Sequence, residues 1–158
     1  MGVMNLKLKN SVLSSLPVVP KELEGKLVLA ATYKLKEREA KLFNGALQAI
    51  IQQLKFDKID FESLTKVNAV FTDDGSIELS FESGVAGVHF ALAIYAVGLW
   101  DRLNFNEAKR ILVFIEELCH HYWRIEDELI VKYKVHEIFS RFIPGYKIEE
   151  LFNLGSLK

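Results

Sequence analysis

Apolar residues recur at helical spacing along much of this chain. Between residues 40 and 54 they fall three or four positions apart, at Ala40, Phe43, Leu47, Ile50 and Leu54. That period places them on one face of a helix. A similar spacing occurs earlier, at Leu23, Leu27 and Ala30. Because Pro20 suits the start of a helix, we expect a helix from about Lys21, followed by a second helix or by a bent continuation to residue 54.

Two short runs alternate between apolar and polar residues, which is the pattern of a β-strand. Their apolar positions are Val67, Ala69 and Phe71, and then Ile77, Leu79 and Phe81. Between them stands Thr72-Asp73-Asp74-Gly75, and an Asp-Gly pair between alternating runs is typical of a hairpin turn. We expect a β-hairpin over residues 67–81, with its apolar face against helices, because a lone hairpin is marginally stable.

The stretch from Val85 to Trp100 is apolar on all sides except for His89 and two glycines. This pattern predicts a helix buried in the core or at a subunit contact. The stretch is shorter than the roughly 20 apolar residues of a membrane span. His89 has two interpretations: it is a core histidine that forms a hydrogen bond, or a metal ligand that reaches toward His120 from a neighbouring helix.

The two ends of the chain carry shorter elements. Residues 1–19 suggest an irregular N-terminal arm, although the alternation at Leu6 and Leu8 also allows a brief strand on a sheet edge. Asn106 can cap a helix, and the apolar stripe that follows extends to Phe142, so residues 106–142 form one helix or two that meet near residues 124–127. The sequence of residues 147–153 predicts a last short helix. The expected fold is α+β and mostly α: a helical layer with the 67–81 hairpin packed on it.

Composition limits the function classes. A chain of 158 residues suits a single domain, and a net charge of −1 gives no bulk attraction to nucleic acid or to an anionic membrane, so we expect neither as a partner. The charged run 34–41 carries both signs and suggests a solvated segment. Cys119 is the only cysteine, and the N-terminus lacks the apolar core of a signal peptide, so we expect a cytoplasmic protein. The surplus of apolar surface predicts a homodimer.

Residues capable of chemistry gather at helical spacing between Ile111 and Glu128. On a helix Glu116 faces His120, and Glu117 faces both His120 and His121, because positions three and four apart are neighbours. Imidazole and carboxylate groups are ordinary ligands of zinc, iron and manganese. This polar stripe is therefore either a metal site or a solvated helix face.

The residues Glu116-Glu117-Leu118-Cys119-His120 resemble the H-E-x-x-H helix of the zincin-type metallopeptidases, with Glu116 in place of the first histidine. The resemblance implies that His120 is a zinc ligand, that Glu117 is the general base, and that Glu116 is a carboxylate ligand. His121, Glu126 or Glu128 would complete the ligand set. Glu126 follows His120 by six residues, as in some zincins, but a helix that runs straight through would point Glu126 about 240° away.

These patterns lead to two hypotheses about function. The first is a zincin-like, metal-dependent hydrolase or a degenerate relative, with zinc as the cofactor. The second is a non-enzymatic helical protein of interaction or assembly, without a metal site. Other chemistries lack their motifs: the sequence has no Gly-rich phosphate loop and no second E-x-x-H for a ferritin-like di-iron centre.

Overall fold

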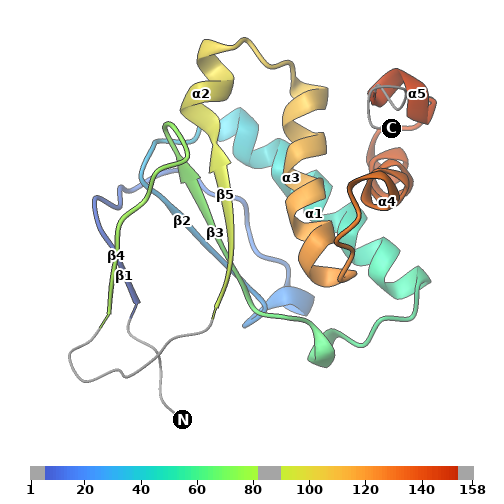
Figure 1. The fold of residues 1–158 in the computed structure, drawn as a ribbon, viewed down its shortest axis with the longest axis horizontal. Coiled ribbons are helices and arrows are strands. Elements are labelled where there is room, and N and C mark those ends of the chain that lie inside the picture. The colour runs from blue at the N-terminus through green and yellow to red at the C-terminus, as the bar shows by residue number, and fades with distance from the viewer. Residues whose placement is uncertain (1–5, 82–89, 153–158) are drawn as a thin grey trace.

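A small parallel sheet lies beside a group of helices in the computed structural model, which describes residues 6–81 and 90–152 (Figure 1). The strands are β1 (Leu6–Leu8), β2 (Leu27–Ala31), β3 (Val67–Thr72), β4 (Leu79–Phe81) and β5 (Ala91–Ala96). The α-helices are α1 (Glu37–Phe56), α2 (Val97–Arg102), α3 (Glu107–Tyr122), α4 (Glu128–Phe142) and α5 (Ile148–Leu151). Short 3-10 turns occupy Lys21–Leu23 and Phe61–Ser63.

The strands β2, β3 and β5 form the parallel sheet in that order, with Ala69 of β3 opposite both Leu29 and Ala93. Parallel neighbours need a long connection, and the 20 residues of α1 supply it between β2 and β3. The strands β1 and β4 form a separate antiparallel pair. The brief N-terminal strand is thus present, on a partner strand of its own.

The expected hairpin over residues 67–81 is wrong. Its two strands exist, but β3 lies in the parallel sheet and β4 pairs with β1. The Asp-Gly segment does turn the chain, since the Gly75 N–H donates to Thr72 Oγ1 over 2.8 Å and Gly75 has a φ of +92°. However, the Asp73 carbonyl accepts a 2.7 Å hydrogen bond from the Leu99 N–H, which ties the turn to α2. The chain then leaves the sheet.

The expected apolar helix over residues 85–100 is wrong for most of its described part, and only its last four residues are helical. Residues 91–96 form β5, and α2 begins only at Val97. A short strand made only of apolar residues has the same sequence pattern as a segment of a buried helix, so periodicity does not separate the two. The same ambiguity explains why residues 27–31 form β2 although we expected them in a helix. His89 lies outside the described residues, so both of its interpretations stay predictions.

The helices of the remaining chain follow the amphipathic pattern. The period at residues 40–54 is confirmed by α1, Asp60 caps the short turn after it, and Asn106 caps α3 by accepting from the Lys109 N–H. Residues 106–142 form two helices, not one. The charged run 34–41 is not wholly solvated, because it includes the buried residues Leu35 and Glu39.

The core lies between the sheet and the helices. Four rings from different elements stack there, Phe43, Phe71, Tyr95 and Phe114, with the centroids of Phe43 and Phe114 only 4.4 Å apart. The Tyr95 hydroxyl donates to the Phe114 carbonyl, so its polar atom is satisfied inside the core. These contacts fix α3 against β5 and thereby set the position of every polar group on α3.

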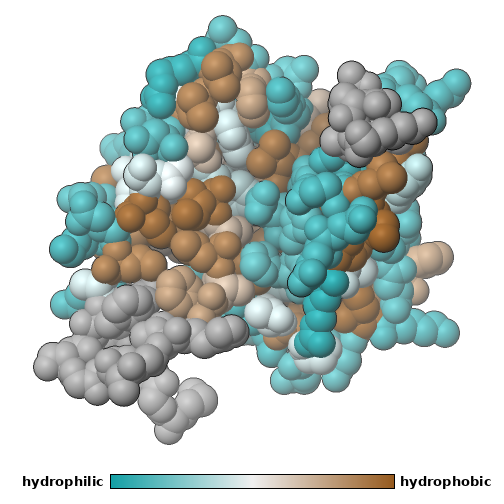
Figure 2. Space-filling model, in the orientation of Figure 1, coloured by the Kyte–Doolittle hydropathy of each residue, from teal (hydrophilic) through white to brown (hydrophobic). Residues whose placement is uncertain are grey.

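Apolar side chains also reach the surface over the sheet, as Figure 2 shows for one side of the molecule. Val28 is 42% exposed, and Leu92 and Ile94 are half-buried. The expected homodimer needs such a surface and stays a prediction. Among the described residues, no helix is long and apolar enough to cross a membrane.

Candidate metal centre

A helical hairpin, formed by α3, α4 and the five residues between them, positions the polar groups singled out by the sequence. The helix α3 ends at Tyr122, and Arg124 adopts a left-handed conformation with a φ of +54°. The Asp127 carboxylate then caps α4 by accepting from the backbone N–H groups of Leu129 and Ile130. The two helices pack against each other, so residues at the end of α3 meet residues at the start of α4.

Two side-chain pairs join the helices one turn apart. His120 Nε2 lies 3.6 Å from Glu128 Oε1, and Glu116 Oε1 lies 2.8 Å from Lys132 Nζ. In each helix the two positions differ by four residues, so both side chains lie on the same face. The hairpin therefore brings a histidine, two carboxylates and an ammonium group together.

Glu116, His120 and Glu128 form a possible metal-binding group. Each offers one ligand atom, and these atoms all lie within 4.8 Å of one another. Around a tetrahedral zinc ion with bonds of about 2.0–2.1 Å, ligand atoms lie about 3.4 Å apart. The His120–Glu128 separation of 3.6 Å is close to that spacing, and the widest separation in the group would have to contract by up to about 1.4 Å. Three protein ligands with an open fourth position are typical of catalytic zinc sites.

The orientation of His120 favours metal binding. Its Nδ1 lies 2.6 Å from the Ile125 carbonyl oxygen, and a carbonyl only accepts, so Nδ1 carries the hydrogen. In the neutral ring Nε2 then has a free lone pair, and this atom faces Glu128. A carbonyl that fixes the tautomer of a histidine is the usual support for a metal ligand. The Ile125 carbonyl reaches His120 only because the chain turns at Arg124.

Glu117 lies beside this group with its carboxylate partly buried. Burial raises the pKa of Glu117, the electrostatic interaction with the His120 ring lowers it, and the charges of Glu116 and Glu128 raise it further. Among the described residues, no hydrogen bond or ion pair holds its carboxylate. A carboxylate with a raised pKa and no partner is suited to accept a proton.

The other two suggested ligands lie outside this group. Glu126 is exposed in the turn between the helices. His121 points to the sheet, where it forms a hydrogen bond with the backbone of Leu92, and burial lowers its pKa. The group thus selects Glu128 from the three residues proposed to complete the site.

Lys132 is the residue that the sequence analysis missed. Its side chain is 15% exposed, and its ammonium group also lies 4.9 Å from the centre of the Phe152 ring. The spacing of Glu128 and Lys132 on one helix face was visible in the sequence. Their pairing with His120 and Glu116 depends on where α3 ends, and the sequence left that open.

Comparisons of this chain with protein families, curated proteins and solved structures found no match. The functional argument therefore depends on the geometry of this hairpin.

Proposed function

We propose that the protein is a zinc-dependent hydrolase in which Glu116, His120 and Glu128 hold the metal and Glu117 is the general base. One observation carries this proposal: the α3–α4 hairpin gathers three potential ligand atoms within 4.8 Å and holds His120 Nδ1 on the Ile125 carbonyl, so that the neutral ring offers Nε2 as the ligand atom. The position of Glu117, next to the first ligand in sequence, is the one it would have in the zincin-like motif.

The chemistry divides among these residues. A bound zinc ion would supply a Lewis acid that polarises the bond to be cleaved and activates a water molecule. Glu117 takes the proton from the attacking water, since burial strengthens it as a base, and passes the proton to the leaving group. The Ile125 carbonyl holds the His120 ring in place while charge develops nearby.

Measuring hydrolysis and zinc content on the same samples tests this division of roles. The Glu117→Gln variant should retain zinc and lose hydrolysis of a fluorescence-quenched peptide library by at least about 100-fold, because an amide does not accept the proton. Glu116→His, which completes the H-E-x-x-H pattern, should bind zinc more tightly. Unchanged hydrolysis in Glu117→Gln would exclude Glu117 as the base.

A second function, a non-enzymatic role in assembly, is favoured by one observation. The Lys132 ammonium group already neutralises Glu116, so this carboxylate has a partner without any metal. In that case the stripe on α3 is a structural ion-pair network, and the apolar surface over the sheet mediates self-association as a homodimer. A protein that binds no zinc and hydrolyses no peptide would favour this function.

A further inference from the structure

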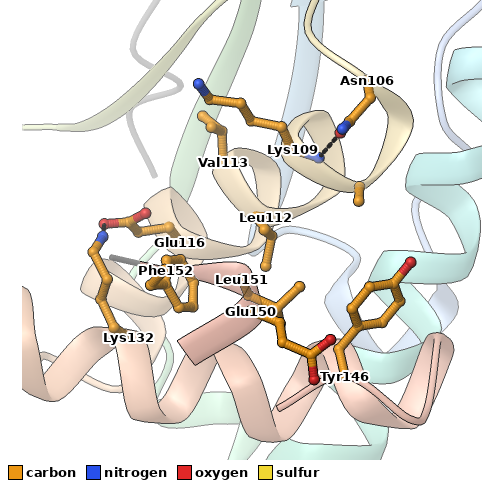
Figure 3. Close-up of a pocket in the computed structure, with 11 residues that line it drawn as sticks. Asn106, Lys109, Leu112, Val113, Glu116, Lys132, Tyr146, Glu150, Leu151 and Phe152 are labelled. Atoms are coloured by element: carbon orange, nitrogen blue, oxygen red, sulfur yellow. Dashed lines mark hydrogen bonds and ion pairs between the residues drawn. The ribbon is translucent and has the colours of Figure 1, made fainter. Parts of the chain in front are cut away.

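A cleft of about 470 Å³ opens beside Glu116, between α3, α4 and α5 (Figure 3). Its volume lies within the range of small-molecule sites. Leu112 and Val113 of α3 form one apolar wall, and Leu151 and Phe152 form another. Figure 3 shows the Glu116–Lys132 ion pair at one end of this cleft, next to Phe152. The cleft and the metal-binding group therefore share Glu116.

The charges that line the cleft balance as long as no metal is present. Lys109 and Lys132 contribute ammonium groups, and Glu116 and Glu150 contribute carboxylates. Glu150 is already engaged, since its Oε1 accepts from the Lys147 N–H over 3.0 Å. A metal ion on Glu116 would neutralise one negative charge of this set and weaken the ion pair of the largely buried Lys132 ammonium group.

We propose that this cleft binds an apolar group that ends in a carboxylate, and that Lys132 pairs with that carboxylate once the metal occupies Glu116. The inference rests on the proposed function. The substrates would then be short peptides, or acylated amino acids, with an apolar C-terminal residue and a free carboxylate. Lys132 is thus a specificity-determining residue and not a ligand.

The dimensions of the site agree with this substrate class. Lys132 Nζ lies 2.8 Å from Glu116 Oε1, an oxygen of the carboxylate that would bind the metal. One residue of a peptide spans about 3.8 Å, so a terminal carboxylate on Lys132 places the preceding peptide bond near the metal. The apolar walls then accept the side chain of the residue to be released. Glu117, on the adjacent face of α3, is available as the base.

Calorimetric titration of the 158-residue chain with 3-phenylpropionate, an apolar carboxylate without a peptide bond, tests the inference. The zinc-loaded protein should bind this probe at least about tenfold more tightly than the zinc-free protein, in which Lys132 remains on Glu116. It should bind the uncharged amide of the probe at least about tenfold more weakly. Lys132→Met should lose the preference for the carboxylate and should also bind zinc more tightly, because the competing ammonium group is gone. Lys132→Arg should keep the preference.

Lys109→Met is the matched control, since it removes the other ammonium group of the cleft and should leave the preference unchanged. If Lys132→Met binds the probe as the unmodified chain does, the carboxylate binds the metal directly, and the inference is overturned while the proposed function stands. Equal binding of the probe and its amide also overturns the inference, because the carboxylate charge then contributes nothing to binding. If the unmodified chain takes up no zinc, both the inference and the proposed function are overturned. Circular dichroism of each variant shows that it is folded.

Discussion

Asp57 joins three helices, and its charge should be a large contributor to stability. The residue ends α1, and its Oδ2 accepts from Trp123 Nε1 over 2.8 Å and from Lys134 Nζ over 2.9 Å. Gln53 Nε2 adds contacts of 3.2 Å to both carboxylate oxygens. Only 21% of the Asp57 side chain and 17% of the Lys134 side chain are exposed. Solvent therefore screens this pair weakly.

Replacing Asp57 by Asn keeps the shape and removes the charge. A hydrogen bond to a charged group contributes about 1.5–3 kcal/mol, and Lys134 keeps Glu137 as a second partner at 3.3 Å. We therefore expect Asp57→Asn to lower the free energy of unfolding by about 2 kcal/mol at pH 7. For a chain of this length that corresponds to a fall in Tm of about 4–8 °C.

The loss should depend on pH in a definite direction. Burial raises the pKa of Asp57, but the hydrogen bonds from Lys134, Trp123 and Gln53 outweigh it, so the pKa in the folded protein is below its ordinary value. A group with a lowered folded pKa stabilises above its unfolded pKa, about 3.9 for Asp, and loses that effect as the pH falls through the folded value. The difference between the two proteins should thus shrink below about pH 4.

Urea unfolding at pH 7 and at pH 3 measures both effects. Glu62→Gln, at an exposed carboxylate, is the control and should change stability by less than about 0.5 kcal/mol. A difference for Asp57→Asn that is equally large at both pH values, or below about 0.5 kcal/mol at pH 7, would refute the reasoning.

Two further substitutions test the fold around the sheet and the site. Gly98→Ala should destabilise the protein by about 1–3 kcal/mol in urea unfolding, because a Cβ atom there would lie 2.7 Å from the Asp73 carbonyl oxygen, and unchanged stability would show that the backbone gives way. Asp127→Ala should cost about 1 kcal/mol by removing the cap from two N–H groups of α4, whereas Asp127→Asn should retain most of the stability; equal losses in both variants would mean that the charge, and not the cap, matters.

The sequence predicts the helices better than the sheet, for a physical reason. A helix such as α1 has apolar residues at a helical period in the sequence, because one of its faces is buried and the other is exposed to solvent. A capping residue such as Asn106 marks the start of α3. The strand β5 is a continuous apolar run, Ala91–Ala96, and a short apolar run has no period that separates a strand from a buried helix. The Asp-Gly turn depends on local residues and is present as predicted. Whether the two strands beside it pair with each other depends on tertiary structure, which the local sequence does not show.

The candidate site, too, is predicted by the sequence only in part. The spacing of Glu116, Glu117 and His120 within one helix is visible in the sequence, because a helical turn fixes which positions are neighbours. Glu128 rather than Glu126 joins the group because the chain turns at Arg124, which adopts a left-handed conformation. The sequence does not predict this turn, because the position is not a glycine. The role of Lys132 requires the packing of α4 on α3, so it followed only from the structure.

Zinc uptake across a set of single variants tests the central claim most directly. Equilibrium dialysis with elemental analysis should give about one zinc per chain, lost in His120→Ala and weakened at least about tenfold in Glu116→Ala and in Glu128→Ala. Glu126→Ala and His121→Ala should bind zinc as the unmodified chain does, because neither side chain belongs to the group. No zinc in the unmodified chain, or full occupancy in His120→Ala, would contradict the proposed metal centre.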